Sequence, residues 1–98
     1  MLNQTVLVGR LTSDPEINEV DGVKVCNITI AVPRSFKNEN GEYDTDFIPV
    51  KLHRGIAENT VEYCKKGDLV GVKGRIEIDT DTIKVVAEKV TFLSSKRD

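Results

Sequence analysis

The sequence has little of what metal centres, membrane spans and disulfide scaffolds require. It contains one histidine, two cysteines and no tryptophan. The histidine and the cysteines lack the paired spacing of a metal site, so we expect neither a metal nor a cofactor. No apolar run approaches the ~20 residues that cross a bilayer, and the first four residues do not resemble a signal peptide. We therefore expect a single cytoplasmic domain over residues 1–98, with no membrane contact.

The two cysteines lie in different kinds of apolar surroundings. Cys26 falls in a strand-like segment and Cys64 in a helix-like segment. A cytosolic setting keeps thiols reduced, and a buried thiol packs like a small hydrophobic side chain. We expect both cysteines to be core residues rather than a disulfide or metal ligands.

The overall charge does not by itself favour a nucleic-acid partner, since the net charge is −2. The distribution is uneven, however. Residues 1–22 contain one cation and four carboxylates, whereas residues 65–75 contain four cations and one carboxylate. A basic patch of strand size can exist on an acidic protein. An ordinary solvated charge pattern is the alternative interpretation.

Turn signals divide the chain into short β-rich segments. Alternating or β-branched residues predict strands that begin near residue 5 and that cover residues 23–32, 47–53, 69–78 and 83–92. Residues 56–64 instead carry an apolar stripe with helical spacing, followed by Gly67 near the helix end. Three strands, a helix and two strands predict an all-β, five-stranded Greek-key barrel with one short helix between strands 3 and 4. A small five-stranded sandwich is the alternative.

The strand over residues 47–53 carries the clearest candidate binding face. Ile48, Val50 and Leu52 share one parity and should face the core, which leaves Phe47, Lys51 and His53 on the outside. Exposed rings stack on any base, and nearby cations attract phosphates, so this pattern binds single strands without selecting a sequence. Two further aromatic residues, Phe36 and Tyr43, flank the turn before this strand. The alternative is that the phenylalanines are ordinary packing or interface residues.

These segments, in this order, resemble the bacterial single-stranded DNA-binding protein family. The resemblance includes VLVGRLT at residues 6–12 with DPE at 14–16, NITIAV at 27–32 and YCKKGDLVGVKGRI at 63–76. Shorter similarities occur at residues 1–4, 46–48, 57–59 and 86–93. The resemblance implies an OB-fold and sequence-tolerant binding of single-stranded DNA in replication, recombination and repair. It also implies a homo-oligomer, at least a dimer and in the family a tetramer, with Val6 and Val8 available to pair across a two-fold axis.

The family's stacking positions fall on Phe36, Phe47 and His53, where the histidine replaces the usual larger aromatic ring. A histidine can still stack, with a charge that depends on its protonation. Together with neighbouring cations, these positions give the DNA-binding residues that we expect: Arg34, Phe36, Phe47, Lys51, His53, Arg54, Lys66, Lys73 and Arg75.

Three features depart from the family pattern. The hairpin between the last two strands is short and places Glu77 and Asp79 where carboxylates would repel phosphates, which puts the tetramer in doubt. Pro49 interrupts the third strand and predicts a local bulge. The sequence stops at residues 96–98 without the acidic tail that recruits partner enzymes, so we expect no tail-dependent partners. We expect weaker binding and a smaller footprint than in typical relatives.

Other functions compete with DNA binding. An OB-fold module that acts through protein contacts is one alternative, favoured by the two hairpin carboxylates and by His53. An enzyme is another, with Asp14/Glu16 and Asp44/Asp46 as carboxylate pairs, but no nucleophile, phosphate loop or metal spacing accompanies them, so we expect no catalytic residues. RNA is an alternative ligand, because stacking and phosphate contacts tolerate ribose.

Overall fold

The computed structural model describes residues 1–94, and the expectation about a missing tail concerns residues 96–98, which lie outside the described residues. The described residues form six strands and one helix: β1 (Thr5–Leu11), β2 (Asn18–Val20), β3 (Val23–Lys37), β4 (Tyr43–His53), α1 (Arg54–Tyr63), β5 (Leu69–Asp79) and β6 (Thr82–Phe92). Helix α1 begins two residues earlier than the stripe predicts and ends one residue earlier.

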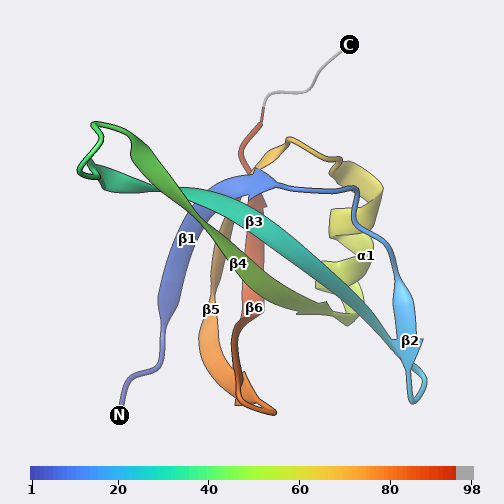
Figure 1. Cartoon of the computed structure of the whole chain (residues 1–98). Coiled ribbons are helices and arrows are strands. Elements are labelled where there is room, and N and C mark those ends of the chain that lie inside the picture. The colour runs from blue at the N-terminus through green and yellow to red at the C-terminus, as the bar shows by residue number, and fades with distance from the viewer. Residues whose placement is uncertain (95–98) are drawn as a thin grey trace.

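Five of the strands close into a barrel (Figure 1). The strand order is β1-β5-β6-β4-β3, and β3 returns to β1 through Arg10↔Ala31 and Leu11↔Ile30. All pairings are antiparallel except β4–β6, which is parallel. The predicted five-stranded barrel, with its helix between the third and fourth barrel strands, is therefore confirmed. The short β2 adds to the edge of β3 and has no counterpart in the sequence-based prediction.

The core lies inside the barrel, and α1 covers part of it with Ala57 and Thr60. The side chains of Ile30, Leu52 and Val70 are completely buried. Both cysteines are buried free thiols whose pKa is raised by burial, so their assignment to the core is confirmed.

The hairpin between β3 and β4 is longer than the sequence predicts. The predicted strands end at residue 32 and begin again at residue 47, but β3 runs to Lys37 and β4 starts at Tyr43. The ladder register shifts between Pro33 and Lys37. Residues 33–47, called the arm below, extend away from the barrel (Figure 1).

The predicted bulge at Pro49 is wrong. The β3–β4 ladder runs without a shift from Val25↔His53 to Pro33↔Thr45, and Pro49 lies opposite Thr29. The carbonyl of Thr29 accepts a hydrogen bond from the Thr12 amide, so Thr29 directs its backbone groups away from β4. Thr29 and Pro49 therefore form a pair without hydrogen bonds, and the proline removes no donor from this ladder. On the other side of β4, pairing with β6 starts only at Val50.

No helix among residues 1–94 has the length and apolar character needed to span a membrane.

Candidate nucleic-acid interface

The outer face of β3 and β4 presents the side chains that alternate with the core. Val50 is 1% and Leu52 0% exposed, Ile48 packs against the core, and Phe47 is 65% exposed. The predicted division of this strand into an inner and an outer face is therefore confirmed. The register places small or polar residues of β3 beside the outer residues of β4, in the pairs Ala31↔Phe47, Thr29↔Pro49 and Asn27↔Lys51. Nothing bulky on β3 therefore stands in line with the Phe47 ring.

Further cations adjoin this face. Lys51 pairs with Val86 of β6, and Val86 pairs with Arg75 of β5, so Lys51 and Arg75 lie on one row across three strands. His53 ends β4 beside this row. Its burial, followed by the charges of Lys51 and Arg75, lowers its pKa and so favours the neutral imidazole. The structure thus brings Lys51, His53 and Arg75 together, and Phe47 lies four residues before Lys51 on the same face of β4.

The arm carries two further exposed rings. Phe36 on β3 is 64% exposed and Tyr43 on β4 is 56% exposed. The ammonium of Lys37 lies 5.9 Å from the centroid of the Tyr43 ring. Each ring therefore has a free surface on which a base could stack.

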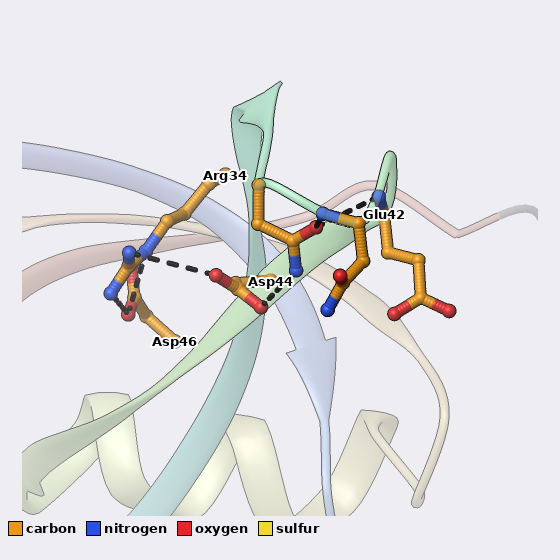
Figure 2. A network of polar contacts seen from close by, with 6 residues as sticks. Arg34, Glu42, Asp44 and Asp46 are labelled. Atoms are coloured by element: carbon orange, nitrogen blue, oxygen red, sulfur yellow. Dashed lines mark hydrogen bonds and ion pairs between the residues drawn. The ribbon is translucent and has the colours of Figure 1, made fainter.

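The arginine of the arm is bound by carboxylates of the same arm (Figure 2). Arg34 donates from Nε and Nη2 to Asp46, with donor–acceptor distances of 3.0–3.3 Å, and its Nη1 lies 3.9 Å from Asp44 Oδ2. These carboxylates were candidates for an enzyme site by sequence, but in the fold they hold an arginine.

The other hairpin has a matching arrangement. Arg75 donates to Glu77 Oε2 over 3.1 Å from Nε and 2.7 Å from Nη2, and its Nη1 lies 3.5 Å from Glu88. Asp79 accepts from Lys84 at 2.7 Å, and this contact is the main reason that the pKa of Asp79 is lowered. The two hairpin carboxylates expected to repel DNA are thus each paired with a cation.

The remaining predicted cations are more dispersed. Arg54 is exposed at the start of α1 and adopts a positive φ of 54°, which is uncommon for a residue with a side chain. Lys66 and Asp14 line a polar cavity of about 550 Å³. The backbone amide of Lys66 donates a hydrogen bond to the Asp14 carboxylate at 2.8 Å. Lys73 lies on β5 opposite Val6 and Lys89. Within the basic segment at residues 65–75, Lys66 therefore lies beside Asp14, whereas Lys73 and Arg75 lie two residues apart on β5.

Sequence reasoning missed the ionic partners of the arm. The side-chain oxygen Oδ1 of Asn38 accepts hydrogen bonds from the backbone amides of Asn40 and Glu42, at 2.8 and 3.0 Å. The side-chain nitrogen Nδ2 of Asn38 donates a hydrogen bond to Asp44 at 3.1 Å. The signal was present as a turn at residues 38–41 with opposite charges on its two sides. If the two predicted strands are extended to this turn, Arg34 lies across from Asp44 and Asp46.

Comparison with known proteins places this chain in a family. The profile of the single-strand binding protein family matches residues 2–93. The chain belongs to this family. It is 43% identical to single-stranded DNA-binding protein B of Bacillus subtilis, an alignment that covers 98% of this chain and 94% of that protein. Identity is also 43% to single-stranded DNA-binding protein 1 of Clostridium acetobutylicum, with coverage of 99% and 98%.

A solved structure supports the same assignment of the fold. The crystal structure of a deletion mutant of the single-stranded DNA binding protein from Thermus aquaticus matches with a TM-score of 0.77 at 27% identity. The match covers 97% of this chain and 52% of the Thermus chain, so this chain spans about half the length of that protein. The barrel of this single-strand binding family member is thus an OB-fold.

Proposed function

We propose that this chain binds single-stranded DNA with little sequence preference through the outer face of β3 and β4 and the arm. The observation that carries the proposal is the exposure of two phenylalanines, 64% for Phe36 on the arm and 65% for Phe47 on the face of β4 that also holds Lys51 and His53. Stacking on bases would give these exposed rings a partner.

Stacking provides the affinity, and dispersed cations provide the attraction to phosphate. Stacking contributes about 1–3 kcal/mol per base and accepts every base, because each has a π-face. Binding of this kind serves to protect or organise single strands in replication, recombination or repair. Since the β5–β6 hairpin is short and two arginines are already paired, we expect weaker binding and a smaller footprint than in longer relatives. The two free thiols fit the cytoplasmic location that we propose.

The direct test is fluorescence anisotropy of labelled oligo-dT titrated with the protein across a salt series. We expect saturable binding that weakens as salt rises, because phosphate contacts release counterions. The absence of binding at low salt and micromolar protein would refute the proposal. Oligo-rU in the same titration shows whether the 2′-OH changes the affinity, since the proposed contacts do not require deoxyribose.

We also propose a homodimer formed along β1. Strand β1 pairs with β5 from Thr5 to Arg10, but it pairs with β3 only at Arg10 and Leu11. The other edge of residues 5–8 is therefore open, and Val6 and Val8 on it are 67% and 49% exposed. An open edge with apolar side chains favours pairing with a second copy. Native mass spectrometry with and without oligo-dT would report the oligomer, a tetramer included, and its stoichiometry.

One observation favours a second function, contact with another protein. Ile76, Ile78 and Ile83 of the β5–β6 hairpin are 46%, 73% and 61% exposed and form an apolar strip that stacks poorly on bases. A protein-interaction module would keep its activity after loss of the arm aromatics and lose it after replacement of these isoleucines.

A further inference from the structure

The six cations predicted for the interface fall into two groups. Within residues 1–94 no ion pair engages Lys51, Arg54, Lys66 or Lys73. Arg34 and Arg75, in contrast, each lie between two carboxylates. The two arginines are therefore the cations whose charge is cancelled before any DNA binds.

The geometry at Arg34 leaves its preferred phosphate-binding edge occupied. The Nε and Nη2 donors, which form the fork that binds phosphate or carboxylate in a bidentate manner, both point to Asp46. Asp44 adds a second negative charge at 3.9 Å. One cation faces two carboxylates, so this part of the arm is net negative and repels a phosphate until the pairing changes.

The arm itself holds these carboxylates in place (Figure 2). Asn38 binds the backbone of the turn and donates to Asp44, which fixes the carboxylate beside Arg34. The paired side chains nevertheless remain 45–51% exposed. An ion pair this exposed is weak, at most about 1 kcal/mol, and a phosphate of a strand bound at the arm can replace it.

On the basis of the DNA binding proposed above, we propose that Asp46, assisted by Asp44, competes with DNA phosphates for Arg34. Binding at the arm is then an exchange of a carboxylate for a phosphate. The carboxylates weaken the binding of single strands and reduce its dependence on salt, because part of the charge gained from phosphate contact is lost from the internal pair. The two carboxylates therefore lower the affinity for single-stranded DNA below the value that stacking alone would give.

The test compares variants of the arm that each replace one carboxylate with a neutral amide, by anisotropy with oligo-dT across a salt series. Asp46→Asn keeps an acceptor for Arg34 but removes the charge. We expect it to bind about two- to fivefold more tightly and to steepen the slope of log K against log salt by about 0.7, the value of one released phosphate contact. Asp44→Asn should act in the same direction with a smaller effect.

Glu42→Gln is the matched control. Glu42 lies on the same arm and loses the same charge, but no ion pair links its side chain to Arg34 among the described residues. In an Arg34→Gln background, Asp46→Asn should improve binding no more than Glu42→Gln does, because the competed cation is gone.

The outcomes separate the two proposals. If the wild-type protein binds DNA and Asp46→Asn behaves like Glu42→Gln, the competition is refuted while DNA binding stands. If wild-type protein does not bind at all, the proposed function fails, and the competition with it. Should Asp46→Asn lose its fold in a thermal scan, the Asp44→Asn and Arg34→Gln pair decides the question by the same comparison.

Discussion

The two hairpins that leave the barrel share one arrangement of charges and differ in their exposed apolar side chains. Each places one arginine between two carboxylates, and each contains one register shift, between Pro33 and Lys37 in the arm and between Lys73 and Gly74 in the other. The arm exposes aromatic rings, whereas the β5–β6 hairpin exposes isoleucines.

This difference indicates which hairpin meets the bases. Charge alone does not separate the two hairpins, because the arginine of each is already neutralised. A flat ring gains from stacking on a base, while a branched aliphatic chain has no comparable surface and gains mainly from contact with other apolar side chains. We therefore expect the arm to contact DNA and the β5–β6 hairpin to contact another protein.

The largest expected effect comes from removing the arm aromatics. Phe36→Ala with Phe47→Ala should weaken binding of oligo-dT by about 30-fold or more, since each lost stack is worth about 1–3 kcal/mol. Both rings are exposed, so the fold should persist in a circular dichroism melt.

The matched control changes the other hairpin, with Ile76→Ala and Ile78→Ala. It should leave the DNA affinity within about twofold, because aliphatic chains do not stack. Equal losses in both double variants would erase the distinction between the hairpins, and an unchanged affinity after loss of both rings would remove the arm from the binding site.

The second prediction concerns the register shift in the β5–β6 hairpin. A Cβ added at Gly74 would collide with the backbone carbonyl of Val86, which cannot move without breaking the ladder. Gly74→Ala should therefore destabilise the protein by about 1–3 kcal/mol in urea unfolding. Gly71→Ala on the same strand is the control, because its nearest neighbour, Leu93 Cδ1, lies at an ordinary 3.4 Å. Similar stability of the two variants would show that this hairpin is not as tightly constrained as its geometry indicates.

The smallest effect is a dependence on pH at the junction of β4 and α1. Burial and the charges of Lys51 and Arg75 lower the pKa of His53 from its ordinary 6.5. A phosphate nearby favours the protonated ring, so binding of oligo-dT should tighten about two- to fivefold between pH 7.5 and 5.5. Asp46 and Asp79 stay ionised in this window, because their ion pairs with Arg34 and Lys84 lower their pKa.

The stability of the free protein should change in the opposite direction. Because the pKa of His53 is lower in the folded state, the unfolded chain binds more protons near pH 6. The contribution of His53 is fully present above pH 6.5 and is lost as the pH falls from there through the folded-state pKa. His53→Gln should flatten both profiles, measured by anisotropy and by thermal melts. A variant that keeps the wild-type pH dependence of binding would show that His53 does not face the strand.

Local patterns were enough to predict most of the barrel. The alternation over residues 47–53 gave the core side and the outer side of β4, and the apolar stripe at residues 56–64 gave α1 within two residues. The burial of Cys26 and Cys64 followed from their apolar neighbours. These features depend on residues two to four positions apart, so a short segment contains the information for them.

The site was predicted less completely. Phe47, Lys51 and His53 share one strand, and their common face followed from period two alone. Lys73 has the charge expected of a DNA-binding residue, and the fold places it beside Val6 and Lys89 on β5, two residues from Arg75, which the sequence alone does not show. The proline at position 49 looked like a ladder defect, because the sequence does not show which backbone groups its partner strand uses.

The sequence by itself determined the elements, their order and the aromatic character of one strand and its turn. Only the tertiary structure decided how far the arm extends beyond the barrel. That length matters because Asp44 and Asp46 have the parity of the core residues, and inside a barrel they would be buried at great cost. Beyond the barrel, the same parity leaves them in solvent beside Arg34, with which they form the ion pairs of the arm. Alternation is encoded over a few residues, but where a strand leaves the barrel depends on pairing between segments far apart in the chain.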